Sequence, residues 1–390
     1  MPYEIYLKKN EEKRIVDGHS WVYANEVQKI EGKDKNGSLA TVYDFSGRYI
    51  GKGFINHASK ILVRIFIRDN SEADKQLFLD RIKAADDYRQ KLGFTDCYRV
   101  VFAEADDLPA LIIDKYHDIY CVQFLSLGMD RIKDIIKECI IELFSPRGIY
   151  ERSDASVREK EGLPLINNYL YGEFDTRVTV IENGLKMICD LKNGQKTGYF
   201  LDQKENRLAL RRYVKNAEVL DCFCNSGGFS LNAAAGGAKK VTALDISQTA
   251  LNDVEENAKI NGYSEIIKTV QGDVFKVLRE YKKDGLSFDV IVLDPPAFTK
   301  SVSEVNDALR GYKDINILGM KLVKKGGFLI TSSCSHYVTL PLFMKMLEEA
   351  AAQSGKKVRC VEIKSQSSDH PSLIAADETM YLKFFVLHIT

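Results

Sequence analysis

Residues 217–230 read AEVLDCFCNSGGFS, and this stretch decides the fold of the chain. An apolar run that ends in Asp221 predicts a buried strand, the Asn-Ser-Gly-Gly segment predicts a tight turn, and the last residues open a helix. In doubly wound α/β domains this arrangement forms a ligand-binding corner at the carboxyl end of the first strand. The stretch therefore predicts a nucleotide-like ligand beside residues 221–230.

Downstream of this stretch, strand-like and helix-like segments alternate, which is typical of a parallel sheet with helices on both faces. The segment SQTALNDVEENAKING predicts a helix with Ser247 as its N-cap and Gly262 just past its end. The last two strand-like segments, VRCVEIKS and MYLKFFVLHI, have no helix between them and are expected to pair antiparallel. The five strands predicted before them are residues 218–223, 240–245, 266–271, 288–294 and 327–333.

The chain before this sheet predicts two smaller domains, since 390 residues are too many for one ordinary core. Residues 1–70 alternate at the strand period around turn residues and predict a small β-barrel. Residues 71–175 combine helices over 71–93 and 129–144 with strand-like segments and predict a small α/β domain. The third domain, residues 176–390, begins with a hairpin whose turn is Asn183-Gly184.

Composition narrows the class of protein. Lys and Arg together number 55, as do Asp and Glu, so net charge gives no sign of a nucleic-acid partner. No apolar run is long enough to span a bilayer, and no secretory pattern opens the chain. We therefore expect a cytoplasmic protein with reduced thiols and no membrane partner. The eight cysteines lack metal-site spacing, so no metal is expected.

Five polar residues fall where predicted strands end, namely Asp221, Asp245, Asp273, Asp294 and Cys334. Because the carboxyl ends of parallel strands share one edge of a sheet, these side chains are expected to converge on one crevice. The turn after the first strand lacks the G-x-G-x-x-G spacing of dinucleotide-binding enzymes. An adenosine without a diphosphate is therefore expected, and S-adenosylmethionine fits. Asp245 would hold its ribose, and Asp273 would lie near its adenine unless it serves only as a helix N-cap.

Two motifs point to the reaction. DPPAF, at residues 294–298, places a carboxylate on a rigid strand exit, which suits methylation of a base nitrogen or a ring carbon. SSCSH, at residues 332–336, places a thiol at the same edge. A thiolate that adds to carbon-6 of cytosine makes carbon-5 able to take a methyl group, provided that the thiol pKa is lowered. A lone cysteine on a strand is usually a small buried residue, but the position of Cys334 at the functional edge argues against this alternative. For His336 two interpretations stay open, assistance to the thiol and a solvated loop residue.

These residues, in this order, resemble the bacterial 23S ribosomal RNA 5-methylcytosine methyltransferases that carry an N-terminal PUA domain. The resemblance spans the whole chain and rests on long runs rather than on DPP alone. In sequence order these runs are GHSWVY (18–23), GKGFIN (51–56), EADDLPALIIDKY (104–116), YERSDASVREKEGL (150–163), NGQKTGYFLDQKENR (193–207), DCFCNSGGFS (221–230), DVIVLDPPAF (289–298), RGYKDIN (310–316) and SSCS (332–335).

The resemblance implies an RNA-binding PUA barrel, a small central α/β domain and a class I methyltransferase domain. This last domain is Rossmann-like, with a seven-stranded sheet that ends in an antiparallel hairpin. By the same resemblance Cys334 is the nucleophile, and Asp294 holds and polarises the cytosine. The implied partner is 23S ribosomal RNA or a large-subunit assembly intermediate, and a homodimer stays open. The residues expected to bind S-adenosylmethionine are Phe200, Gln203, Asp221, Phe223, Asn225, Ser226, Gly227, Gly228, Asp245, Ile246, Asp273, Val274 and Asp294.

One departure concerns product release. Many RNA 5-methylcytosine enzymes have a second cysteine after the proline of the strand-four motif, but here Pro296 follows Pro295. This agrees with the pattern of the resembled family and leaves water, a phosphate or Asp294 as acceptors of the carbon-5 proton.

Three other functions compete with this hypothesis. The same fold can methylate guanine nitrogen-7 or an exocyclic amine, which would not need Cys334. A non-catalytic RNA-binding or ribosome assembly factor can retain a cofactor fold. A dinucleotide oxidoreductase is disfavoured by the turn sequence.

Overall fold

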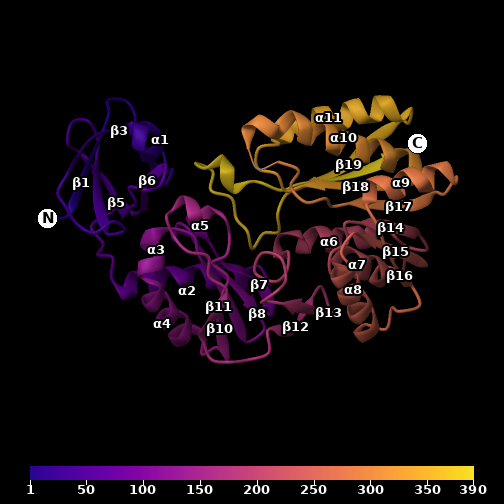
Figure 1. The fold of residues 1–390 in the computed structure, drawn as a ribbon, viewed down its shortest axis with the longest axis horizontal. Helices are drawn as coiled ribbons and strands as arrows, with labels where there is room; N and C mark the ends of the chain where they lie inside the picture. The colour runs from indigo at the N-terminus through magenta and orange to yellow at the C-terminus, as the bar shows by residue number, and fades with distance from the viewer. Residues whose placement is uncertain (300) are drawn as a thin grey trace. The chain divides into compact units, whose positions relative to one another are not determined.

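The computed structural model describes residues 1–299 and 301–390, whose strands form four sheets in two compact units (Figure 1). The first unit comprises Met1–Val180, Cys189–Leu201 and Ser368–Thr379. The second comprises Ile181–Ile188, Asp202–Ser367 and Met380–Thr390. Each unit therefore combines segments that are far apart in the sequence.

The first unit opens with a six-stranded sheet in the order β2-β6-β5-β4-β1-β3. All neighbours pair antiparallel except β1 and β4, which pair in parallel. The sheet encloses its own apolar core, in which Ile5, Val22 and Val42 are fully buried. This agrees with the all-β domain predicted for residues 1–70. The strands are β1 (Tyr3–Leu7), β2 (Trp21–Tyr23), β3 (Val27–Glu31), β4 (Leu39–Tyr43), β5 (Tyr49–Ile55) and β6 (Ile61–Ile67), with the short helix α1 (Lys13–Val16) after β1.

A second sheet of the same unit has five strands in the order β11-β10-β9-β8-β7. Its core joins strand residues such as Val100 and Ile113 to helix residues such as Phe78 and Ile136. The helix predicted over 129–144 is present in two pieces, because Ser126 caps an earlier start and the backbone at Ile132 leaves the helical region. The elements are α2 (Lys75–Lys91), β7 (Cys97–Phe102), β8 (Leu111–Tyr116), β9 (Ile119–Phe124), α3 (Leu127–Arg131), α4 (Lys133–Phe144), β10 (Gly148–Glu151), α5 (Val157–Lys160) and β11 (Asn168–Tyr171).

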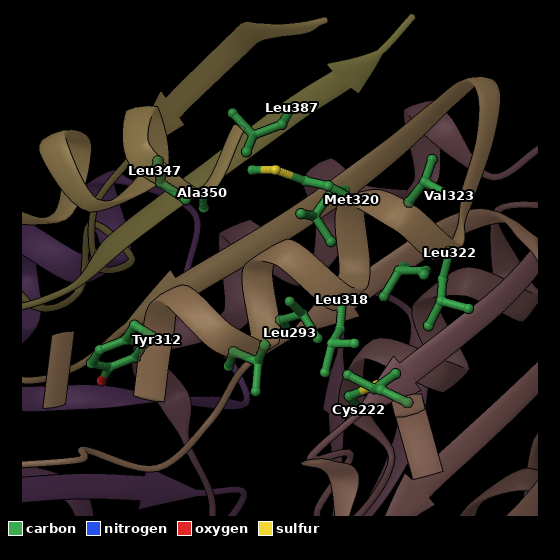
Figure 2. Close-up of a cluster of buried hydrophobic side chains, with 14 of the residues drawn as sticks. Cys222, Leu293, Tyr312, Leu318, Met320, Leu322, Val323, Leu347, Ala350 and Leu387 are labelled. Atoms are coloured by element: carbon green, nitrogen blue, oxygen red, sulfur yellow. The ribbon is translucent and has the colours of Figure 1, made fainter. Parts of the chain in front are cut away.

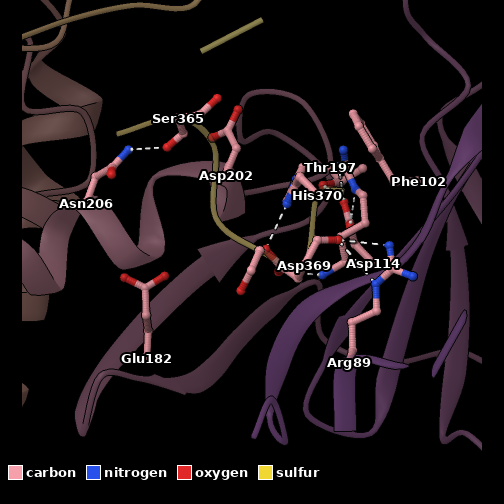
Figure 3. Close-up of polar contacts among 12 residues, drawn as sticks. Arg89, Phe102, Asp114, Glu182, Thr197, Asp202, Asn206, Ser365, Asp369 and His370 are labelled. Carbon is pink, nitrogen blue, oxygen red and sulfur yellow. Dashed lines mark hydrogen bonds and ion pairs between the residues drawn. The ribbon is translucent and has the colours of Figure 1, made fainter. Parts of the chain in front are cut away.

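A buried arginine fastens the segment Ser368–Thr379 inside this unit (Figure 3). Arg89 of α2 is fully buried and forms a bidentate ion pair with Asp106, at 2.6 and 2.8 Å. Its Nη2 also donates to the carbonyl of Asp369 at 2.9 Å. Asp369 in turn accepts the backbone N–H of Arg99 at 3.0 Å. A segment from the last part of the sequence is thereby tied to the first unit.

A two-stranded hairpin of β12 (Arg177–Glu182) and β13 (Leu185–Asp190) follows. Its turn residues Asn183 and Gly184 both adopt left-handed backbone angles, with φ of 54° and 76°. This is the geometry that the Asn-Gly turn signal predicts.

The second unit contains a seven-stranded sheet in the order β16-β15-β14-β17-β18-β20-β19. Neighbours from β16 through to β18 pair in parallel, and β20 pairs antiparallel with both β18 and β19. The predicted doubly wound sheet with a terminal antiparallel hairpin is therefore confirmed. The strands are β14 (Glu218–Cys222), β15 (Lys240–Asp245), β16 (Ile267–Gln271), β17 (Phe288–Leu293), β18 (Val323–Ser333), β19 (Val358–Lys364) and β20 (Lys383–Ile389).

Helices cover both faces of this sheet (Figure 1). One face packs on α9, α10 and α11 around a core that includes Cys222, Leu293, Tyr312 and Leu318 (Figure 2). The other face carries α6, α7 and α8. Within the described residues, none of the helices is both long and apolar enough to cross a bilayer. The helices are α6 (Lys204–Leu210), α7 (Gly228–Ala235), α8 (Gln248–Ile260), α9 (Val274–Lys283), α10 (Val305–Leu322) and α11 (Leu340–Ser354).

Candidate active site

The turn between β14 and α7 is built around the buried carboxyl group of Asp221. Asp221 lies in the last part of β14 and is fully buried. Its Oδ2 accepts a hydrogen bond from the hydroxyl of Ser230 at 2.6 Å. Its Oδ1 is buried without a hydrogen-bond partner among the described residues. Burial raises the pKa of Asp221 to about 7, and the nearby charge of Asp294 adds to this rise.

Glycine is required at the position where the turn enters α7. Gly227 has a φ of 86°, and a Cβ built there would lie 3.1 Å from the side chain of Val254 on α8. The preceding carbonyl, that of Ser226, accepts a hydrogen bond from the buried amide of Asn257 at 3.1 Å. Phe223 and Asn225 also adopt positive φ, of 62° and 47°. The loop therefore passes close to α8 at Gly227, where a residue with a side chain would be both strained and crowded.

Asp245, the last residue of β15, holds the turn from the neighbouring strand. Its Oδ2 accepts the backbone N–H of Asn225 at 3.0 Å, and its Oδ1 accepts that of Ser247 at 2.9 Å. Each carboxylate oxygen keeps a second acceptor site, so Asp245 can still bind hydroxyl groups. The following Ile246 is 67% exposed and leaves an apolar surface beside the strand end.

Asp273 follows β16 and is the N-cap of α9, where its Oδ1 accepts the backbone N–H of Lys276 at 3.0 Å. The predicted cap is thus confirmed, as is the N-cap of α8, where Ser247 accepts from Ala250 at 3.3 Å. The side chain of Val274 is buried in the core under α9, so only its backbone is left to face a ligand.

The carboxyl group of Asp294 lies directly after β17 in a chain of hydrogen bonds (Figure 3 shows its far end). Its Oδ1 accepts from the amide of Gln203 at 2.8 Å and from the hydroxyl of Ser332. Gln203 is oriented by Asn206, which donates to its Oε1 at 2.7 Å and to the carbonyl of Ser365 at 3.0 Å. Among the described residues, the side-chain hydrogen bonds to Asp294 all go to Oδ1, so its Oδ2 is left to accept from a ligand. Burial raises the pKa of Asp294 to about 6, against the opposing effect of the Ser332 hydrogen bond.

Cys334 follows β18, the strand next to β17 in the sheet. It is partly exposed, whereas its neighbours Ser332, Ser333 and Ser335 are each at most 1% exposed. Of residues 332–335, Cys334 is therefore the one that is accessible to solvent. His336 is exposed, with its ring 5.3 Å from that of Tyr337. This favours the solvated-loop interpretation of His336.

Cys334 and Asp294 both interact electrostatically with a third residue, Tyr312 of α10. Burial raises the pKa of Tyr312 above its usual value, and the charges of Cys334 and Asp294 both contribute to the rise. The negative charges of Asp294 and Asp245 likewise both raise the pKa of Asp221. Asp221, Asp245, Asp294 and Cys334 thus act electrostatically at the same edge of the sheet, and their convergence on one binding crevice stays a prediction.

Phe200 is the one predicted pocket residue that belongs to the first unit, where Lys196 lies 4.8 Å from the centre of its ring. Its assignment to the cofactor pocket stays a prediction.

Sequence reasoning missed three residues that support these groups, Ser230, Ser332 and Lys383. The first two carry short polar side chains that reach Asp221 and Asp294. Lys383 begins the largely apolar strand KFFVLHI, and a lysine next to such an apolar run is the sequence signal that points to it.

Two family models match the chain. Residues 164–385 match a model described as S-adenosylmethionine-dependent methyltransferase, and residues 5–68 match a PUA-like domain. The first match contains every candidate residue described above and the seven-stranded sheet except for the last four residues of β20.

Several proteins called ribosomal RNA large subunit methyltransferase I are similar over their whole length. The protein of Vibrio vulnificus strain YJ016 is 40% identical over 99% of both chains, and that of Aeromonas salmonicida is 42% identical over 98% of both. Among solved structures, an S-adenosylmethionine-dependent methyltransferase from Streptococcus mutans shares the fold with a TM-score of 0.85, at 21% identity over 100% of both chains.

Proposed function

Because the chain belongs to the S-adenosylmethionine-dependent methyltransferases, within the ribosomal RNA large subunit methyltransferase I group, we propose that it makes 5-methylcytosine in 23S ribosomal RNA. The observation that carries the proposal is the pairing of two groups at one sheet edge. Cys334 and Asp294 are both partly exposed, they follow adjacent strands, and the charges of both act on Tyr312. A thiol is needed for carbon methylation of cytosine and not for nitrogen methylation.

The turn and the strand ends fit S-adenosylmethionine, which supplies an electrophilic methyl group when bound. This cofactor is cationic at its sulfonium and ammonium groups, and the buried Oδ1 of Asp221 lacks a partner among the described residues. A buried carboxylate of this kind favours a cation beside it. Asp245 would bind the ribose hydroxyls, Ile246 would pack on the adenine and Asp273 would accept from its amino group. The backbone of residues 223–228 and the side chain of Gln203 complete the proposed pocket.

Asp294 would hold the target cytosine. Its Oδ1 is fixed by Gln203 and Ser332, so its Oδ2 is presented to a ligand in one orientation. A carboxyl group with a pKa of about 6 can accept a hydrogen bond from the exocyclic amine and can also take up a proton near neutral pH. Accepting from the exocyclic amine would position the base, and donating the acquired proton to ring nitrogen-3 would make carbon-6 more electrophilic.

Cys334 would act as the nucleophile. Its thiolate forms a bond to carbon-6 of cytosine, and the ring electrons move to carbon-5, which becomes nucleophilic. Once carbon-5 carries the methyl group, water, a phosphate or Asp294 would accept its proton. The electron pair of that C–H bond would form the double bond between carbon-5 and carbon-6 as the bond between sulfur and carbon-6 breaks, which restores the thiolate. Because the base must leave its stack to reach both groups, the target nucleotide is flipped or unpaired.

The other domains would bind the RNA. The PUA-like model matches residues 5–68, and RNA is commonly recognised by shape and backbone contacts. We propose domains at residues 1–70, 71–175 and 176–390, supported by the sheets that fall within each range. A cytoplasmic location and a substrate of free 23S RNA or an assembly intermediate belong to the same proposal. Its residues all come from one chain, so it does not require a homodimer.

The decisive experiment uses 23S ribosomal RNA with 5-fluorocytosine in place of cytosine. Fluorine at carbon-5 cannot leave as a proton does, so the enzyme with S-adenosylmethionine should form a stable covalent adduct with the RNA. Cys334→Ala should abolish the adduct and methylation, while Cys360→Ala, at an exposed cysteine of β19, should leave both unchanged. Denaturing gel electrophoresis and mass spectrometry of the digested adduct identify the linked cysteine.

Two results would favour the rival functions. Methylation that survives Cys334→Ala, with the product identified as a nitrogen-methylated base, would support the same fold acting on guanine or on an exocyclic amine. Cofactor binding without methyl transfer to free RNA or to isolated subunits would support an assembly factor.

A further inference from the structure

Lys383 is a buried lysine next to the segment that carries Cys334. It is the first residue of β20 and is 5% exposed. In the antiparallel pairing of β18 with β20, Lys383 lies opposite Ser333, the residue before Cys334. Lysine is almost never buried to this degree unless its charge is compensated.

The ammonium group of Lys383 binds the backbone on both sides of this strand pair. Its Nζ donates to the carbonyl of Ser335 at 2.6 Å and to that of Tyr381 at 2.8 Å. Ser335 is 1% exposed and directly follows Cys334. The charge is therefore anchored beneath the loop that presents the thiol, and an ammonium group has three protons to donate.

We propose that the Lys383 ammonium stabilises the thiolate form of Cys334 and holds it in the position for attack. This inference rests on the proposed function, in which Cys334 is the nucleophile. An anchored positive charge beside a thiol favours loss of the thiol proton, most strongly where water is excluded. Lys383 touches neither substrate nor cofactor in this role and is a positioning residue.

The electrostatic interaction between the two groups supports this direction. Burial lowers the pKa of Lys383 to about 8, and the negative charge of Cys334 acts against that lowering. Such an interaction is mutual, so the ammonium lowers the proton affinity of the thiol by the same energy. Below a pH of about 8 Lys383 is mainly charged, so the stabilisation is present at neutral pH.

The other titratable groups around the thiol differ from Lys383 in sign or in position. Tyr312 opposes thiolate formation when ionised, since the charge of Cys334 raises the pKa of Tyr312, and Asp294 also carries a negative charge when ionised. His336 is exposed in the following loop. Tyr381 donates its hydroxyl to Asp202 at 2.6 Å. Lys383 is thus a buried cation that interacts with Cys334.

The test measures the thiolate directly, without RNA or cofactor. Wild-type enzyme is alkylated with iodoacetamide across pH 5.5–10 (roughly the window of thiol titration), and mass spectrometry of the Cys334 peptide gives the rate. In Lys383→Met the midpoint of the rate–pH profile should move up by about one unit, so that alkylation at neutral pH falls about tenfold. Lys383→Arg should keep the wild-type midpoint, as should the exposed control Lys345→Met.

A purely structural role for Lys383 predicts a different profile. If the lysine only fastens the loop, Lys383→Met changes the limiting rate at high pH and leaves the midpoint where it is, which would overturn the inference. Should Lys383→Met fail to fold, Lys383→Gln, whose amide still donates to a carbonyl, gives the same comparison. The alkylation test can fail independently of the 5-fluorocytosine test. The first measures the ionisation of the Cys334 thiol without methyl transfer, whereas the second measures whether Cys334 forms an adduct with RNA.

Discussion

The carboxyl groups Asp221 and Asp294 bind their protons more tightly in the folded chain than an exposed aspartate does. Burial is the main cause in both, and each also feels the charge of another carboxyl group. The folded protein without ligand therefore loses stability when these groups ionise. This cost is tolerated at a place where cationic and hydrogen-bonding ligands are expected, which is usual for functional sites.

Replacing Asp221 with asparagine should stabilise the chain at high pH. The pKa of Asp221 is about 7 in the folded state and near its ordinary value in the unfolded state. Between these values the folded state holds the proton that the unfolded state has released, so stability falls as pH rises from about 4 to about 7. Asp221→Asn removes this loss and should raise the free energy of unfolding by up to about 4 kcal/mol at pH 8, with little gain at pH 4.

Urea unfolding at the two pH values checks this prediction. The exposed Asp284→Asn should change stability by less than about 0.5 kcal/mol at either pH. A gain for Asp221→Asn that is equal at both pH values would contradict the assigned cause.

Several contacts between residues of the site could not be predicted from the sequence, because they join positions that are far apart in the chain. The acids and Cys334 are found from the sequence, since each follows a recognisable strand. The hydrogen bond from Gln203 to Asp294 spans 91 positions, and that from Lys383 to Ser335 spans 48. The second depends on the register of an antiparallel pair, which no local pattern specifies.

At the scale of single elements, the ends of strands and helices determine the site. The strand over Lys240–Asp245 is found with its predicted bounds because a buried apolar run ends cleanly at an acid. β18 instead begins at Val323, before the predicted residue 327. A register shift between Phe288 and Val290 on the neighbouring β17 lets the strand continue through Gly326, whose φ is 89°. The prediction places the start of β18 after Gly326 because a Gly-Gly pair usually marks a break, whereas here the pair lies within an irregular part of the strand.

The two roles of Asp273, as the N-cap of α9 and as the proposed adenine ligand, can be separated by substitution. Serine caps a helix as well as aspartate does, but its side chain is shorter and neutral. Asp273→Ser should therefore leave the free energy of unfolding within about 0.5 kcal/mol, whereas Asp273→Ala should lower it by about 1 kcal/mol. Both variants should bind S-adenosylmethionine about tenfold more weakly if the carboxylate contacts the adenine, as the loss of one charged hydrogen bond implies.

Isothermal titration of the cofactor and thermal unfolding give the two readouts. Wild-type cofactor affinity in Asp273→Ser would restrict Asp273 to its capping role.

At the scale of the whole molecule, the chain crosses between its two compact units at five places. The first unit depends on Ser368–Thr379, a segment that lies between β19 and β20 in the sequence. Arg89 binds this segment while it is paired with Asp106. Neither unit is therefore a continuous stretch that a single cut would release.

Replacing Arg89 with methionine should weaken the first unit. The substitution leaves the carboxylate of Asp106 and the carbonyl of Asp369 without their buried donor, and breaking such a pair costs about 3 kcal/mol. Hydrogen exchange should accelerate in Ser368–Thr379, and the urea midpoint should fall. Lys83→Met, which removes an exposed ion pair with Asp87 on the same helix, should change stability by less than about 0.5 kcal/mol. Unchanged exchange in Ser368–Thr379 would contradict the role given to Arg89.

The interleaving of the segments also sets the order of events during protein synthesis. The sheets of the first unit emerge from the ribosome long before residues 368–379, since Asp202–Ser367 must be translated in between. At typical elongation rates this interval lasts roughly 10–30 s. During this interval Arg89 has its ion-pair partner Asp106 but lacks its hydrogen bond to the carbonyl of Asp369. The nascent first unit therefore lacks the contacts of Ser368–Thr379 until nearly the whole chain has been made.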